Sequence, residues 1–126
     1  MQKLSTIQKH HNLNAVFRLG EEGPGGAYHD YGVELVGAKV EDVDTDSVMV
    51  AIEFQRGPRY SEDARPGLLD VDLLEIVRDR LQCFQAGPYR TRENACALTH
   101  IEEALMWMNK RTEDRAERAV LGTYEK

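Results

Sequence analysis

The stretch QAGPYRTREN, residues 85–94, decides the second half of the fold, because it separates two apolar patterns of helical period. Before it, five apolar residues follow three- or four-residue steps and so share one face of a helix: Leu73, Leu74, Val77, Leu81 and Phe84. Asp70 or Asp72 is placed to cap the start of this helix, and Gly87 and Pro88 end it. The stretch therefore predicts the turn of a helical hairpin.

The second helix begins after Thr91, a favourable capping residue, with Glu93 in its first turn. Its apolar stripe contains Ala95, Leu98, Ile101, Leu105 and Met108. In an antiparallel hairpin that turns near residue 89, paired residues have numbers that sum to about 179. This register pairs Leu74 with Leu105, Leu81 with Leu98, and Cys83 with Cys96. We interpret the cysteines as buried thiols in a packed seam, and reversible oxidation is the alternative.

The second helix is longer than its partner, so residues 109 to about 119 (NKRTEDRAERA) extend beyond the hairpin. A charged overhang of this length frays unless tertiary contacts hold it, and a second subunit is the simplest cover. Arg111, Arg115 and Arg118 form one stripe on it. The stripe has two interpretations, a solvated face balanced by nearby carboxylates or a clamp for a diphosphate.

The first half of the chain predicts an antiparallel β-sheet. Strand patterns cover residues 12–19, 31–36 and 47–54, and they are separated by the loops 20–26 (GEEGPGG) and 41–46 (EDVDTD). The acidic loop lacks the glycine and glutamate positions of a calcium site, so we interpret it as a solvated connection. Residues 57–68 lead to the hairpin and hold Arg59 and Arg65 beside a tyrosine, with Arg56 just before them.

These segments predict an α+β fold in one domain, residues 1–126. The β-sheet layer covers about 12–56, the connecting loop 57–68 and the helical hairpin about 69–119. A length of 126 residues suits one core better than two. No apolar run is long enough for a membrane span, and the N-terminus lacks the pattern of a secretory signal, so we expect a cytoplasmic protein.

The net charge of −6 disfavours DNA or RNA polymers as partners, because binding a polyphosphate backbone requires a basic surface. Local arginine clusters in an acidic chain indicate a small anion instead. The cysteine spacing does not fit a zinc site, and we expect no cofactor, no metal and no catalytic residues.

The C-terminal residues match a known pattern. The blocks REN-A-ALT and EEALMW-KRT-R-R, within LLEIVRDRLQCFQAGPYRTRENACALTHIEEALMWMNKRTEDRAERAVLGTYEK, resemble the C-terminal hairpin shared by phage Thoeris anti-defence proteins and phage anti-CBASS proteins. The preceding VMVAIEFQRGP also resembles the first of these families, so the similarity covers roughly residues 47–126.

The resemblance implies a protein that sequesters a small cyclic nucleotide immune signal and releases it unaltered. The signals implied are cyclic ADP-ribose isomers made by TIR enzymes, with cyclic di- or trinucleotides of CBASS at separate sites in some members. It also implies dimers that build hexamers, a ligand pocket at a subunit interface, and action in the cytoplasm of the infected bacterial host.

Carried over residue by residue, the resemblance implies that Phe84 stacks on the adenine and that Asn94 hydrogen-bonds polar groups of the ligand. Arg59, Arg111 and Arg115 would hold phosphates and riboses. From the residues alone, Phe84 is equally a core residue of the hairpin and Asn94 an ordinary first-turn residue. The turn at 85–94 is then one wall of an anion pocket, and the arginine overhang is the other.

Two other classes of function remain open. A phosphodiesterase would need paired histidines or a metal cluster to activate water, and the four histidines are not so arranged: His10, His11, His29 and His100. A non-catalytic interaction or scaffold protein would use the hairpin as a dimer seam, with Met106 and Trp107 as ordinary packing, and would bind no small molecule.

Overall fold

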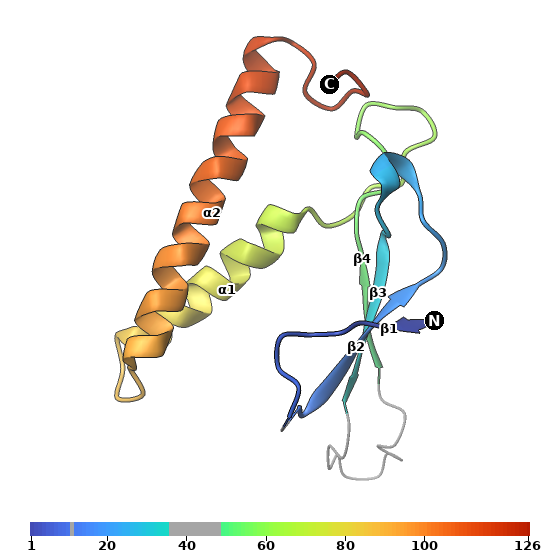
Figure 1. The fold of residues 1–126 in the computed structure, drawn as a ribbon. Coiled ribbons are helices and arrows are strands. Elements are labelled where there is room, and N and C mark those ends of the chain that lie inside the picture. The colour runs from blue at the N-terminus through green and yellow to red at the C-terminus, as the bar shows by residue number, and fades with distance from the viewer. Residues whose placement is uncertain (11, 36–48) are drawn as a thin grey trace. The chain divides into compact units, whose positions relative to one another are not determined.

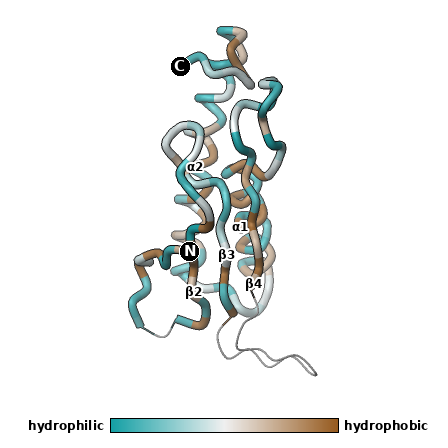
Figure 2. Tube along the Cα trace, turned by 90° about the vertical axis from the view of Figure 1, so that its right-hand side faces the viewer, coloured by the Kyte–Doolittle hydropathy of each residue, from teal (hydrophilic) through white to brown (hydrophobic). Residues whose placement is uncertain are grey.

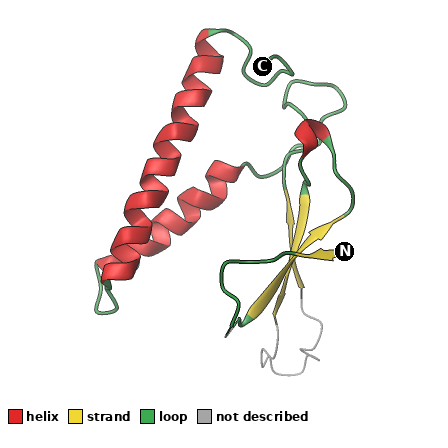
Figure 3. Ribbon diagram, in the orientation of Figure 1, coloured by secondary structure: helices red, strands yellow, loops and turns green. Residues whose placement is uncertain are grey.

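The computed structural model describes residues 1–10, 12–35 and 49–126 (Figure 1). Its residue contacts gather into two compact units. One unit holds Met1–Gly57 and Asp63–Gly67, and the other holds Pro58–Glu62 and Leu68–Lys126. Among the described residues, the first unit contains the strands and the second contains the two α-helices, which confirms the predicted α+β class (Figure 3). The prediction of a single domain stays a prediction.

The sheet is an antiparallel meander of four strands in the order β1-β2-β3-β4. The strands are β1 Gln2–Lys3, β2 Asn14–Leu19, β3 Asp30–Leu35 and β4 Met49–Glu53. Val16 lies opposite Val33, and Val33 lies opposite Val50, so β-branched side chains form one row across three strands. The three strands predicted from the sequence are present within the described residues.

The details of this unit differ from the sequence prediction in two places. Strand β1 was not predicted, because two residues carry no periodicity. The loop 20–26, whose composition opposes regular structure, contains a short 3-10 turn, η1 Pro24–Gly26. The Gly23 N–H donates to the Ala27 carbonyl at 2.9 Å to close it. Residues 36, 47 and 48 and the acidic loop 41–46 lie outside the described residues.

Arg65 anchors the connecting segment to the sheet. One of its guanidinium nitrogens lies 2.9 Å from the Asp30 carboxylate and donates to the Phe54 carbonyl at 2.8 Å. Gly67 lies so close to the chain that a Cβ there would be 2.7 Å from the Phe54 carbonyl carbon, which explains the glycine. The Arg56 guanidinium lies beside Gly23 in the same unit. Arg56 and Arg65 therefore belong to the sheet unit, and Arg59 to the helical unit.

The hairpin is formed by α1 Asp70–Gln85 and α2 Arg92–Glu117. At the start of α1, the Asp72 carboxylate accepts the Leu69 N–H at 2.8 Å, which selects Asp72 over Asp70 as the capping carboxylate. At the start of α2, the Thr91 hydroxyl accepts the Asn94 N–H at 3.0 Å, as the sequence predicts. Within the described residues, no helix is both long enough and apolar enough to cross a membrane.

The Gln85 side chain closes the turn between the helices. Its amide nitrogen donates to the Thr91 carbonyl at 3.0 Å, and its amide oxygen accepts the Thr91 N–H at 3.0 Å. Further along, Arg78 Nε lies 3.0 Å from the Glu102 carboxylate. The sum of the residue numbers 78 and 102 agrees with the sum of about 179 that the sequence predicts for paired residues of this hairpin. Hydrogen bonds to Glu102 and Glu75 raise the pKa of Arg78, so its guanidinium stays charged.

The cysteines are exposed, and the prediction of buried thiols in a packed seam is wrong for the single chain. Cys83 and Cys96 are both free and both accessible. The seam instead contains the half-buried Leu74, Leu81 and Leu98. The cysteines are each two residues from a seam leucine, which on a helix places them away from the contact.

The single chain leaves much apolar surface uncovered. Among the described residues, no apolar side chain is fully buried. Exposed apolar residues of the helices include Ile76, Val77, Met106 and Trp107. Hydrophobic segments recur along both helices (Figure 2). Apolar surface of this extent in a folded chain usually marks a contact surface.

The first prediction tests the cap of α2. Replacing Thr91 by alanine removes the acceptor for the Asn94 N–H and should lower the free energy of unfolding by about 1 kcal/mol. Thr99→Ala is the matched control, because its hydroxyl only donates to the Ala95 carbonyl within the helix. The control should change stability by less than about 0.5 kcal/mol. Urea denaturation at one protein concentration measures both, and equal losses would contradict the capping role.

Candidate functional site

Phe84 and Asn94 lie together at the turn end of the hairpin. Phe84 is in the last turn of α1 and is 42% exposed, so it is not a core residue of the single chain. The Arg80 guanidinium lies 5.6 Å from the centre of its ring. Asn94 is half-buried in the first turn of α2, where Thr91 fixes its backbone. The position of Phe84 makes a ring face available for stacking, with a cation beside it.

Arg90 and Arg92 flank the capping residue Thr91, and both are exposed. They place positive charge near Phe84 and Asn94. The N-terminal end of α2 adds to this charge through its free backbone N–H groups. The turn end therefore gathers several positive groups, with Glu93 as a negative group in the first turn of α2.

The other arginines of the predicted site lie toward the C-terminal end of α2. Arg111 is exposed and has no ion pair or hydrogen bond within the described residues. Arg118 lies 3.6 Å from the Asp114 carboxylate and donates to the Lys126 carbonyl. The arginine stripe predicted from the sequence is therefore divided, because Arg118 has partners and Arg111 has none within the described residues.

Arg115 holds the segment that follows α2. It is 7% exposed, the one buried charged side chain among the described residues. Its guanidinium donates to three backbone carbonyls, those of Val120, Thr123 and Glu125. Three of its five N–H donors are thus used within the chain, and a ligand would have to share or displace these contacts.

Arg59 is brought close to the same segment. The neighbouring Tyr60 N–H donates to the Gly122 carbonyl at 3.2 Å. A Cβ on Gly122 would clash with the Tyr60 ring, and Gly122 has a φ of 79°, so a glycine fits here for two reasons. The exposed Arg59 and the buried Arg115 therefore both lie next to residues 120–125.

The five predicted residues fall into two groups that one chain cannot bring around one small ligand. Asn94 and Arg111 are 17 positions apart on α2, which corresponds to about 25 Å along the helix axis. A compact pocket of about 1,000 Å³, large for a small-molecule site, is only about 10 Å across. The turn and the arginine overhang are thus not two walls of one pocket within a single chain.

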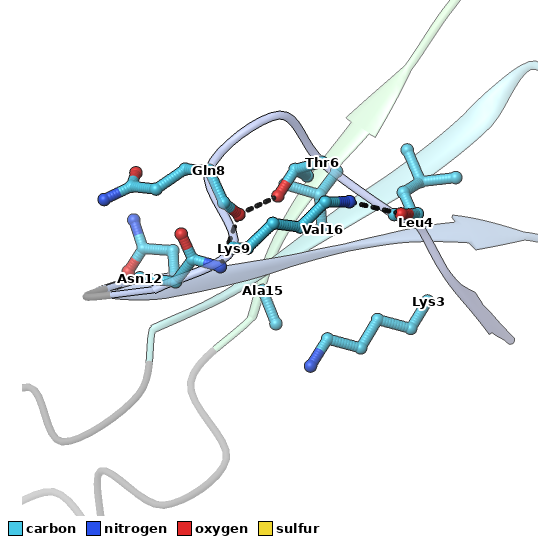
Figure 4. A pocket seen from close by; sticks show the side chains of 10 residues that line it. Lys3, Leu4, Thr6, Gln8, Lys9, Asn12, Ala15 and Val16 are labelled. Atoms are coloured by element: carbon cyan, nitrogen blue, oxygen red, sulfur yellow. Dashed lines mark hydrogen bonds between the residues drawn. The ribbon is translucent and has the colours of Figure 1, made fainter.

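The N-terminal segment forms a separate small hollow of about 180 Å³ (Figure 4). It is lined by residues 3–6, 8–9, 12 and 14–16. The Lys9 ammonium donates to the Ser5 hydroxyl at 2.6 Å, and the Asn12 amide donates to the Gln8 carbonyl at 2.9 Å. These polar groups satisfy one another, and none of the five predicted site residues lies here.

Sequence reasoning missed several residues that shape the candidate site. Gln85 closes the turn, Arg80 lies beside Phe84, and Tyr60 contacts Gly122. Arg80 and Phe84 are four positions apart on a helix, a spacing that could have revealed their contact. The Tyr60 contact joins residues far apart in the chain, and no local pattern signals it.

The helical hairpin and its preceding strand define an α+β protein of a known class. Residues 47–113 match the family described as Acb2/Tad1, hairpin domain, and the chain belongs to this family. It is also 46% identical over 88 residues to the protein named Thoeris anti-defense 1 of Bacillus phage SBSphiJ7. The aligned part is 70% of this chain and 61% of that relative, so the similarity spans less than two thirds of the relative's length.

The second prediction tests the role of Arg115 in the C-terminal segment. Arg115→Ala removes three charge-assisted hydrogen bonds, each of which contributes about 1.5 to 3 kcal/mol at most. Hydrogen exchange of the Tyr60 amide, which depends on the Gly122 carbonyl, should accelerate at least about tenfold, since 1.4 kcal/mol is a factor of ten.

Arg111→Ala is the control, because Arg111 has no contact with that segment within the described residues. It should leave the exchange of the Tyr60 amide unchanged. If Arg115→Ala also leaves it unchanged, Arg115 does not hold the segment.

Proposed function

We propose that this protein binds and sequesters cyclic ADP-ribose-type immune signals without degrading them, and so protects a phage from Thoeris defence. It acts in the cytoplasm of the infected bacterial host. The observation that carries the proposal is the 46% identity with a phage protein named for Thoeris anti-defence. Four of the five proposed site residues, Arg59, Phe84, Asn94 and Arg111, also lie within the range that matches the hairpin family.

The chemistry of these residues fits such a ligand. A cyclic ADP-ribose has one planar base, two riboses and a pyrophosphate. Phe84 offers an exposed ring for the base, and Asn94 offers amide groups for ribose or base edges. Arg59, Arg111 and Arg115 supply guanidinium groups for the pyrophosphate.

The pocket is assembled from two subunits in this proposal. Phe84 and Asn94 come from the turn end of one copy, and the three arginines come from the overhang end of another. The separation of about 25 Å between Asn94 and Arg111 within one α2 supports this division. The uncovered apolar surface of the single chain supports self-association, to a dimer and then a hexamer.

Release of intact ligand is what separates this proposal from its rivals. In the described ranges, no three His, Cys, Asp or Glu residues are placed to hold a metal ion together. A scaffold protein would bind no ligand, and a phosphodiesterase would release a linear product. Cyclic di- and trinucleotides are to be tested as additional ligands, at sites separate from this pocket.

The third prediction follows the fate of the ligand. The protein is incubated with each cyclic ADP-ribose isomer, freed of unbound ligand, denatured by heat and the released compound identified by mass spectrometry. Intact ligand is expected at up to one equivalent per pocket. Linear product would show an enzyme, and absence of any nucleotide would favour the scaffold.

The fourth prediction tests the two-subunit pocket by mixing variants. Phe84→Ala should weaken binding by about 1 to 3 kcal/mol through lost stacking. Arg111→Ala should weaken it by about 1.5 to 3 kcal/mol through a lost charge-assisted contact. Arg111 is a cleaner probe than Arg115, which also holds the chain segment after α2.

When the two weak variants are unfolded, mixed in equal amounts and refolded, mixed dimers contain one pocket with both substitutions and one intact pocket. About a quarter of all pockets should then regain the parental affinity in calorimetry, by random pairing of two-fold dimers. Each variant refolded alone is the control. If the mixture binds no better than the variants alone, the two groups of residues do not come from different subunits.

A further inference from the structure

Gln85 is a polar residue at the end of the apolar face that α1 turns toward α2. Leu74, Leu81 and Gln85 are half-buried and follow steps of seven and four residues, so they lie on one side of the helix. An amphipathic helix normally places an apolar residue at such a position. Polar groups withdrawn from water are costly unless they are hydrogen-bonded, so the partners of Gln85 indicate what it holds.

The Gln85 side chain binds both backbone groups of one residue at the start of α2. Its amide nitrogen donates to the Thr91 carbonyl at 3.0 Å, and its amide oxygen accepts the Thr91 N–H at 3.0 Å. The same carbonyl accepts the Ala95 N–H at 3.1 Å, which is the first hydrogen bond of α2. Two directional bonds to one residue fix its orientation as well as its distance. The start of α2 is therefore held against the last turn of α1.

These bonds lie between two residues of the candidate ligand site. Phe84 directly precedes Gln85, and the Asn94 N–H donates to the Thr91 hydroxyl at 3.0 Å. The backbone N–H groups of residues 86 and 87 bond back to α1 rather than forward to α2. A short path of hydrogen bonds thus connects the aromatic residue at the end of α1 with the asparagine at the start of α2.

A second polar link joins the helices further from the turn. Arg78 Nε lies 3.0 Å from the Glu102 carboxylate, seven residues and about 10 Å along α1 from Gln85. In the described part of the chain, the hydrogen bonds and ion pairs between α1 and α2 with its cap are those of Arg78 and Gln85. Gln85 is therefore the polar link at the turn end of the hairpin, where Phe84 and Asn94 lie.

We propose that Gln85 is a positioning residue of the ligand site, which sets Phe84 and Asn94 in one relative arrangement before the ligand binds. This proposal rests on the proposed function. A ligand that contacts both residues binds with an apparent affinity reduced by the fraction of chains in which they are correctly placed. Holding the arrangement in advance lowers the cost of ordering it on binding. Gln85 acts through these two residues and needs no contact with the ligand itself.

The fifth prediction concerns the replacement of Gln85 by methionine, an unbranched and flexible side chain that favours helix. Gln85→Met keeps the packing against α2 but removes both bonds to Thr91. It should accelerate hydrogen exchange of the Thr91 amide in the free protein. It should also raise the Kd for a cyclic ADP-ribose isomer about tenfold in calorimetry, on the scale of one or two neutral hydrogen bonds. Gln85→Glu, which keeps the acceptor and loses the donor, should also raise the Kd.

Two further methionine variants are the controls. Gln82→Met makes the same change three positions earlier, at an exposed residue whose side chain has no hydrogen bond within the described residues. Arg78→Met removes the link to Glu102 and so lowers the stability of the hairpin away from the turn. Both should bind like the parent at a temperature at which circular dichroism shows every variant folded. Lost stability alone does not change the affinity of a protein that remains folded.

The outcomes separate this inference from the proposed function. If either folded Gln85 variant binds as tightly as the parent, or if Arg78→Met weakens binding as much as Gln85→Met, Gln85 is only a structural residue of the turn. Retention of the ligand by the parent would then still support the proposed function. If the parent binds none of the cyclic ADP-ribose isomers, the proposed function and this inference both fail.

Discussion

The unequal length of the two helices is the constraint on which the helical unit depends. Helix α1 has 16 residues and α2 has 26, so the hairpin can cover only the first part of α2. The remainder is rich in charge, and no other helix of the described residues pairs with it. Its order must come from contacts outside the hairpin, because a short helix without packing is marginal in water. Arg115 supplies one such contact by holding residues 120–125 against the end of α2.

Three arginines of this acidic protein, Arg65, Arg78 and Arg115, join separate segments of the chain. Arg65 joins the connecting segment to Asp30, Arg78 joins the helices through Glu102, and Arg115 holds the C-terminal segment. Hydrogen bonds to Glu102 and Glu75 raise the pKa of Arg78, so its guanidinium stays charged. Arg111 contrasts with these residues, since it is exposed and makes no such contact in the described part of the chain. Among the described residues, it is the arginine of the stripe that makes no contact holding the fold together.

The architecture could be predicted from the sequence where local chemistry determines it. The hairpin could be predicted from its two apolar stripes, and the ends of its helices from Thr91 and the Gly87-Pro88 pair. The antiparallel sheet could be predicted from the alternating pattern of the strands. The exposure of Cys83 and Cys96 could not be predicted, because a shift of two positions on a helix moves a side chain from the contact between the helices to the solvent. The buried Arg115 was also missed as a structural residue, since its acceptors are backbone carbonyls, which no side-chain pattern reveals. The residues proposed to bind ligand came from family resemblance, and the observed α2, Arg92–Glu117, agrees with the predicted long second helix that separates Asn94 from Arg111.

That separation has a thermodynamic consequence if the proposed pocket is correct. A pocket formed by Phe84 of one copy and Arg111 of another exists only in the assembled protein. A ligand that binds only the assembled form stabilises it by mass action, so binding and self-association reinforce each other. Self-association also affects the rate of ligand release. A ligand enclosed between subunits leaves only as fast as the contact around it opens. An interface that is stable without ligand would therefore serve sequestration in two ways. It would preorganise the two halves of the pocket at low protein concentration, and it would slow release of the signal without any chemical change to it.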